Sequence, residues 1–405
     1  MFRFSGRLRG RLFVIPILVL IGSVYVAAAA DGPGLSLAEV QRLAVERQPL
    51  LEGLSAQVAA ARERAVSARQ LPDPQLKLGV QNLPADSADA WRLNRDSMTQ
   101  STVGLAQEFP LAGKRELKSQ AEALKAAAGE AELSAVTRGT ERDAGLAFLD
   151  LLHPHHGALL VQAQIVEAQR ALAAAEIAYR DGQRGQGDVL AARAAVAVLE
   201  DKAAEYGQTY AAARETLGRW IGPVPADAAP DEPMLPPLPP LVTLLDELSR
   251  HPETLAANRD VDRAEVEMRL ARKSRQPDFN VELDYAYRGD YSDMVSLQVA
   301  IPLPIFAANR QDRDIAAARS ELDAQQAMRE DLHRRLSAEL SSMYREWQSL
   351  GTRIDRYQAT VLPPLAARVE ATLAEYRGGT GTFAAVLDSR QALLDAELAL
   401  LELHL

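Results

Sequence analysis

Cysteine is absent from the 405-residue chain. This absence excludes disulfide bonds, thiolate metal sites, a cysteine nucleophile and an N-terminal lipidated cysteine. Aromatic residues make up only 5% of the chain although hydrophobic residues make up 47%. Alanine supplies much of that hydrophobic fraction, so the composition favours long, closely packed helices over one core of bulky side chains.

Basic residues are fewer than acidic ones, 45 against 55, which gives a formal net charge of −10. So acidic a chain is a poor general binder of nucleic acid, and we expect no nucleic-acid partner. Catalytic signatures are also missing, since the sequence contains no G-x-S-x-G, H-E-x-x-H, Walker loop or dinucleotide-binding glycine pattern. We therefore expect neither an enzyme nor a bound cofactor, and the chain has no nucleotide site to power transport.

Long apolar runs are missing after the first thirty residues, so no later helix is expected to cross a membrane. The N-terminus differs, because arginines at positions 3, 7, 9 and 11 precede an apolar run from Leu12 to Val26 and then four alanines. This order is typical of a secretory signal peptide, which we predict over residues 1–30 with cleavage near Ala30. The alternative is a permanent anchor, which Pro16 and the alanine-rich end oppose. The mature chain then leaves the cytoplasm, and any membrane crossing must use strands.

The rest of the chain contains an internal duplication. Gln48-Pro49 and His251-Pro252 each precede a helical stretch, and Pro74 and Pro277 each follow 25 residues later. A second match, at an offset of 197, relates Tyr179-Arg180-Asp181-Gly182 to Tyr376-Arg377-Gly378-Gly379, together with the Val-Leu, Arg and Ala that follow each. We predict a first repeat over residues 31–222 and a second over 241–405. Residues 223–240 between them hold eight prolines and are expected to form a stiff linker.

Each repeat contains a pair of alternating segments, at about residues 75–109 and 278–302. In the second, Phe279, Val281, Leu283, Tyr285 and Tyr287 alternate with polar or small residues, which is the pattern of a strand with one apolar face. The segments are about 8–11 residues long, as a tilted membrane strand requires, although a half-buried soluble hairpin has the same pattern. Two hairpins supply four strands, and open strand edges are not tolerated in lipid. Closure in a membrane therefore needs several copies, and three would give twelve strands.

A very long helical pattern follows each hairpin, from about Lys114 to Tyr179 and from about Arg310 to Tyr376. Each would span on the order of 100 Å, and the four-three spacing of their apolar residues is that of a coiled-coil seam. Glycine-containing turns at 181–188 and 377–384 then lead into return helices. The resulting architecture is mainly α with a pair of membrane β-hairpins, and nothing in it encloses a substrate pocket.

Together these features resemble the TolC-like outer-membrane efflux family over nearly all of the mature chain. The resemblance implies a homotrimer with a 12-stranded barrel in outer-membrane lipid and a 12-helix tunnel in the periplasm. It also implies a passive exit duct in a Gram-negative bacterium, docked by a periplasmic adaptor and driven by an inner-membrane RND-type transporter. Four segments look most like the heavy-metal branch, which serves cobalt, zinc, cadmium, copper or silver pumps: 71–74, 81–84, 96–99 and 107–110.

The same resemblance assigns roles to residues of the two turns. Gly182 and Gly379 match glycines at which adaptor hairpins dock, or they serve only to turn the chain. Asp188 matches an acid that holds the tip gate shut, with Tyr376 as one of its partners. Asp388 matches an aspartate of the ring that lines the constriction, where carboxylates would attract cations. The sequence departs from the pattern at Ala385, which replaces a second acid of the ring, and at Gly381, which replaces a gate arginine; Arg180, Arg377, Arg193 and Arg390 are candidates to replace its bonds.

Other candidates have simpler explanations. Glu282 and Asp284 are expected to face the barrel lumen, or else to be solvated charges at its rim. His153, His155 and His156 could bind zinc, copper or nickel, but Pro154 lies among them and no carboxylate completes a site, so a kinked helix segment is the stronger interpretation. Two rival functions stay open: a duct of the same kind for organic drugs or secreted proteins, and a periplasmic coiled-coil protein that never enters the membrane.

Overall fold

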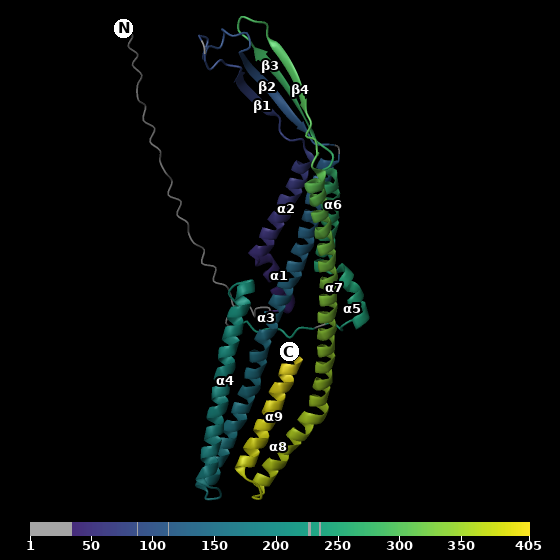
Figure 1. Cartoon of the computed structure of the whole chain (residues 1–405). Coiled ribbons are helices and arrows are strands. Elements are labelled where there is room, and N and C mark those ends of the chain that lie inside the picture. Colours follow the sequence, from purple (N-terminus) through teal and green to yellow (C-terminus); the bar gives the residue numbers. More distant parts are fainter. Residues whose placement is uncertain (1–34, 87, 112, 226–227, 235) are drawn as a thin grey trace, which may run out of the picture.

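The computed structural model describes residues 35–405 except 87, 112, 226, 227 and 235, so the predicted signal segment lies outside the described residues. The molecule is long and mainly helical, with one small antiparallel sheet at one end and two helix turns at the other (Figure 1). The fold class predicted from the sequence is confirmed. Among the described helices, none has the length and apolarity needed to cross a membrane.

The sheet combines two hairpins that are far apart in sequence. Its strands are β1 (Gln75–Gln81), β2 (Gln100–Phe109), β3 (Phe279–Tyr287) and β4 (Met294–Ala300), and they lie in the order β1-β2-β3-β4. The β2–β3 ladder joins the two repeats, from Ser101 opposite Tyr287 to Phe109 opposite Phe279, whose rings stack at 5.2 Å. The first and last strands are therefore β1 and β4, and each has one edge without a partner in the described sheet.

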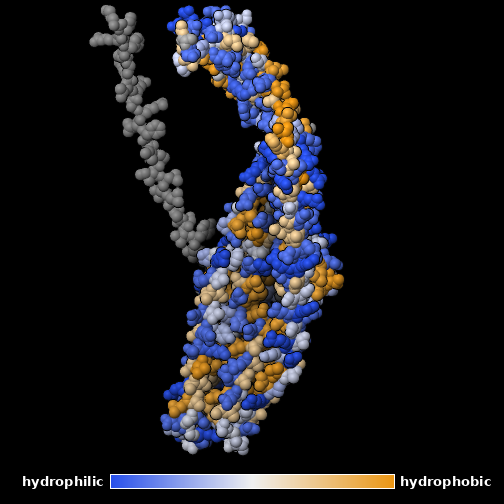
Figure 2. Space-filling model, in the orientation of Figure 1, coloured by the Kyte–Doolittle hydropathy of each residue, from blue (hydrophilic) through white to orange (hydrophobic). Residues whose placement is uncertain are grey.

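One face of the sheet is apolar and uncovered, as the alternating pattern requires when nothing packs on it. Leu78 on β1 and Leu297 on β4 are 73% and 70% exposed. Apolar surface runs along the β4 side of the sheet and continues to the segment after it, where Leu303, Ile305 and Phe306 are also exposed (Figure 2). An uncovered apolar face of this size is typical of a contact with lipid or with another protein.

The described part of the first repeat has four helices: α1 (Leu37–Arg47), α2 (Pro49–Arg69), α3 (Lys114–Arg180) and α4 (Gln186–Ile221). Proline at the first position of α2 separates it from α1; the helical stretch expected after Gln48-Pro49 is α2, and α1 precedes it. Helix α3 is continuous, with Pro154 buried inside it. It packs against α1, α2, α4, α6 and α9, and is therefore the central helix of the molecule.

The second repeat is more interrupted. It contains α5 (Leu241–Glu247), a 3-10 turn (Leu248–Arg250), α6 (Pro252–Lys273), a second 3-10 turn (Ala307–Asn309), α7 (Gln311–Arg356), a π-helical turn (Tyr357–Val361), α8 (Leu362–Arg377) and α9 (Phe383–His404). The expectation of one long helix from Arg310 to Tyr376 is wrong in this detail. The π turn ends where Pro363 and Pro364 enter the first turn of α8, because proline has no N–H to continue the hydrogen bonds of α7.

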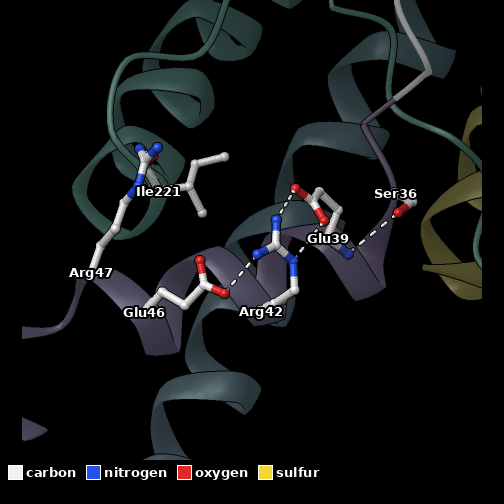
Figure 3. Close-up of polar contacts among 6 residues, drawn as sticks. All are labelled: Ser36, Glu39, Arg42, Glu46, Arg47 and Ile221. Atoms are coloured by element: carbon white, nitrogen blue, oxygen red, sulfur yellow. Dashed lines mark hydrogen bonds and ion pairs between the residues drawn. The ribbon is translucent and has the colours of Figure 1, made fainter.

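The short helix α1 is held at both of its ends by polar contacts (Figure 3). Ser36 caps α1 by accepting a hydrogen bond from the Glu39 N–H at 3.3 Å, and Arg47 at its other end donates to the carbonyl of Ile221, the last residue of α4. This contact satisfies one of the carbonyls that a helix end leaves free. Beyond it, Gly222 turns the chain with φ +83°, and a Cβ there would meet the Arg47 guanidinium. The proline-rich linker then pairs with the N-terminal side of α1 through a bridge between Leu35 and Pro230.

Candidate functional site

The two helix turns come together at the end of the molecule opposite the sheet. Tyr376, near the end of α8, donates a hydrogen bond from its hydroxyl to a carboxylate oxygen of Asp188 in the first turn of α4, at 3.1 Å. Burial raises the pKa of Tyr376, and the Asp188 carboxylate raises it further. The bond joins the α3–α4 pair to the α8–α9 pair, so the structure brings together the two residues that the sequence singled out as gate partners.

A third residue completes this contact. The guanidinium of Arg184, in the turn between α3 and α4, lies 4.3 Å from the centre of the Tyr376 ring and donates to the Tyr376 carbonyl at 2.5 Å. The ring of Phe383, at the start of α9, lies 5.3 Å from the ring of Tyr376. We call Arg184, Asp188 and Tyr376 the tip cluster. It rests on an apolar base of Ala175, Val189, Ala192 and Phe383.

The tip cluster joins the two repeats, and it has no repeat-related counterpart among the described residues. At the offset of 197, Tyr376 corresponds to Tyr179, Arg184 to Gly381 and Asp188 to Ala385. Tyr179 is exposed, and its hydroxyl makes no hydrogen bond within the described part of the chain. The second repeat therefore presents no arginine and no acid to a tyrosine at the positions where the first repeat has both.

The other residues of the predicted gate lie apart from this cluster. Arg193 pairs with Glu176 at 3.2 Å and Arg390 with Glu167 at 3.8 Å, so both arginines bind glutamates of α3. Asp388 is exposed on α9, one turn after the helix begins. The structure gives Asp188 a tyrosine partner and leaves the Asp388 carboxylate at the surface.

The two glycines predicted to receive an adaptor both have left-handed backbone angles, φ +72° at Gly182 and φ +81° at Gly379. Glycine adopts this conformation without the strain that a Cβ introduces. No other atom lies within 4 Å of a Cβ built at either position. Both turns are thus exposed, and both need glycine for the turn itself.

The predicted lumen acids lie on the polar face of the sheet. Glu282 on β3 forms an ion pair with Lys77 on β1, across the intervening strand β2. Beside them, a Cβ at Gly104 on β2 would meet the Asp284 carboxylate at 1.8 Å. Small residues on β2 therefore let charged groups of the flanking strands lie together, and the charge of Glu282 is offset while that of Asp284 has no ion-pair partner in the described chain.

The junction between sheet and helices holds a second polar cluster. Lys114, the first residue of α3, donates to a carboxylate oxygen of Asp278 at 2.9 Å and to the carbonyl of Gln276 at 2.6 Å. The Leu111 N–H donates to the same Asp278 oxygen at 2.7 Å. Burial acts to raise the pKa of Asp278, but the Leu111 N–H and the Lys114 ammonium outweigh it and lower that pKa. The lysine side chain is only 11% exposed, so this cluster is part of the packed junction.

The three histidines lie where α3 packs on α4. The His153 ring is 6.0 Å from the Tyr206 ring, and the His155 ring is 5.8 Å from the Tyr210 ring. Burial, and next the neighbouring His156, lower the pKa of His155. In the part of the chain that the structure describes, no three His, Asp or Glu side chains are grouped to hold a metal ion. The histidines serve this helix contact.

Sequence reasoning gave Arg184 and Lys114 no role. The sequence did contain an indication for Arg184. The repeat offset of 197 aligns it with Gly381, the position at which the family pattern has a gate arginine. The signal for Lys114 was weaker: a lysine opening a long helix reads as a solvated charge, and its partner Asp278 lies 164 residues away. Neither contact follows from local sequence.

Comparisons with known proteins bear on the whole chain. Residues 244–405 match the family described as outer membrane efflux protein. The chain also resembles the outer membrane protein VceC of Vibrio cholerae, with 20% identity over 91% of this chain and 92% of that one and a TM-score of 0.75. The chain also resembles CusC, studied for transmembrane channel formation, with 17% identity over 94% of this chain and 92% of that one and a TM-score of 0.75. The Campylobacter jejuni outer membrane channel CmeC is also similar, with 13% identity over 98% of this chain and 91% of that one and a TM-score of 0.73.

No curated protein sequence matches the chain. The comparisons nevertheless define its fold, which agrees with that of these outer-membrane proteins over more than nine-tenths of the chain. Its second repeat in addition carries the sequence pattern of the outer membrane efflux protein family.

Proposed function

We propose that three copies of this chain form a passive efflux duct in the outer membrane. The observation that carries the proposal is the four-stranded sheet, whose apolar face is exposed and whose two outer edges lack partners in the copy described. Lipid does not tolerate such edges, and three copies of four strands would close them into a twelve-stranded barrel. The predicted signal segment supports export of the chain to that membrane.

The helices support assembly in the same way. Buried positions in the 46-residue helix α7 are confined to Ala318 and Leu322, while Met343 and Trp347 of the predicted coiled-coil seam are 60% and 52% exposed. A neighbouring copy would cover this face, as seam residues of a coiled coil require. The duct would then continue as a helical tunnel through the periplasm, with the tip cluster at its far end.

The proposed partners follow from the tip. The exposed turns at Gly182 and Gly379 would receive a periplasmic adaptor, and an inner-membrane RND-type transporter would supply the energy. The duct itself performs no catalysis. Asp188 and Asp388 would lie near the narrowest point, where carboxylates in a narrow pore favour cations.

We propose heavy-metal cations as the cargo. Support comes from the four segments that resemble the heavy-metal branch, and from Asp284, an acid without an ion-pair partner among the described residues on the polar face of the sheet. The organic-drug duct is the competing assignment, and it predicts a different phenotype.

Growth of a deletion strain distinguishes the two. The strain and a complemented control are grown across zinc, cobalt, cadmium, copper and silver, with detergents and dyes as a parallel panel. Sensitivity confined to metals is the expected result and names the cation. Sensitivity confined to organic compounds keeps the duct and overturns the metal cargo, and growth equal to the control on every compound contradicts an export role.

A further inference from the structure

The ion pair at the sheet–helix junction joins the two repeats within one copy. Lys114 opens the helix that follows β2, and Asp278 directly precedes β3, the strand paired with β2. The junction therefore ties the end of one repeat's hairpin to the start of the next hairpin. This is a seam between repeats, and a closed ring of repeats would contain the same seam again wherever β4 of one copy meets β1 of the next.

We align the two repeats on the strand pair nearest to the helices in each hairpin. Gln75 pairs with Ala106 in the first hairpin and Asn280 pairs with Ala300 in the second. Matching these two pairs places Pro72-Asp73 on Pro277-Asp278 and Pro110 on Pro304. This alignment differs by two residues from the one that matched Pro74 with Pro277 by their equal spacing. Aligning the first residues of the helices that follow places Lys114 of α3 on Gln311 of α7, so Gly113 corresponds to Arg310 after three extra residues in the second repeat.

The counterpart of Asp278 is Asp73, and the base nearest to the counterpart of Lys114 is Arg310, one residue before Gln311. The side chains of Asp73 and Arg310 are exposed, and neither has a polar partner within the described part of the chain. Arg310 is the N-cap residue of α7, directly before its first residue, whereas Lys114 is the first residue of α3. Among its described residues, one copy thus carries an unpaired acid just before β1 and an unpaired base after β4, directly before α7.

We infer that Arg310 of one copy binds Asp73 of the next and fixes the register in which β4 pairs with β1. The inference rests on the proposed trimeric duct and adds the residues that close it. Applying the β2–β3 register, Leu297 lies opposite Val80 and Val299 opposite Leu78. All four side chains belong to the exposed apolar face, so this register keeps that face continuous around the ring.

Disulfide trapping tests the register, because the chain has no cysteine of its own. Residues directly opposite in adjacent strands lie within the Cα separation that a disulfide spans. Leu297→Cys with Val80→Cys is expected to give covalent dimers and trimers on a non-reducing gel. Two controls are matched: Val103→Cys with Tyr285→Cys, which are opposite within one copy and should give no ladder, and Leu297→Cys with Leu76→Cys, which is four residues out of register.

Charge exchange tests the ion pair. Arg310→Asp and Asp73→Arg, each alone, are expected to lower the temperature at which the detergent-extracted trimer dissociates, and the double exchange to restore it. A trimer whose dissociation temperature is unchanged by both single exchanges overturns the ion pair, and a ladder from the out-of-register cysteines overturns the register. If the unmodified chain forms no trimer, the proposed function itself fails, whereas a trimer without the expected ladder refutes this inference alone.

Discussion

Loss of the Tyr376 hydroxyl is the sharpest perturbation of the proposed gate. Tyr376→Phe removes the 3.1 Å hydrogen bond to Asp188 and keeps the ring against Arg184 and Phe383. The change is therefore confined to one bond that links the two helix pairs of a copy. We expect the tip to open more often, because separating the two helix pairs breaks this bond.

The magnitude follows from the type of bond. A hydrogen bond to a charged group contributes about 1.5–3 kcal/mol, and the partly exposed Asp188 places this one near the lower end. A loss of about 1.5 kcal/mol changes the open-to-closed ratio about tenfold in each copy. If three tips open together, the losses add to about 4.5 kcal/mol, a change of roughly a thousandfold.

Open probability in planar lipid bilayers at neutral pH is the assay. Tyr179→Phe is the matched control, because its counterparts of Arg184 and Asp188 are Gly381 and Ala385 and it has no such bond to lose. Tyr376→Phe combined with Asp188→Asn should open the duct no more than the stronger single variant, since both act on the same bond. An open probability that Tyr376→Phe leaves unchanged, or that Tyr179→Phe raises equally, would refute the reasoning.

Three further predictions concern packing and protonation. Gly157→Ala places a Cβ 2.4 Å from the Tyr206 ring and should lower the free energy of unfolding by about 1–3 kcal/mol; Tyr206→Leu in the same chain should restore it in thermal melts. Asp278→Asn leaves Lys114 buried without its charge partner and should cost about 3–5 kcal/mol. Because the pKa of Asp278 is lowered from 3.8, its contribution is complete above that pH and is lost as the pH falls further, so the variant should flatten the acid limb of stability against pH. The pKa of His155 is lowered from 6.5, so protonation is disfavoured in the folded state and stability should fall as the pH drops below 6.5. His155→Gln should remove that dependence. An unchanged slope of stability against pH in this variant would contradict the prediction.

The architecture was predictable because its signals are periodic and occur twice. Alternation in two matched segments gave the hairpins, and the helical spacing after each gave the long helices. Proline was a poorer guide, since α3 continues through Pro154, which is buried inside it. Pro363 and Pro364 instead follow a π turn. Whether a helix continues through a proline depends on the packing around that proline, which the sequence alone does not reveal.

The site was predictable only in part. Asp188 and Tyr376 were named from the repeat and the family pattern, and they are bonded. Arg184 went unnamed because its contact with Tyr376 spans 192 residues and depends on how a glycine-rich turn directs one side chain. Lys114 and Asp278 likewise meet only after two hairpins pair, a tertiary event that neither local sequence reveals.

The central claim is that this chain acts as a ring of three copies, and the mass of the detergent-extracted protein tests it most directly. Native mass spectrometry after detergent removal in the gas phase counts the copies without assuming a shape. The account predicts a complex of three chains that resists dilution, because each copy's β1 and β4 edges are covered only by its neighbours. A single chain that remains folded in detergent would contradict it.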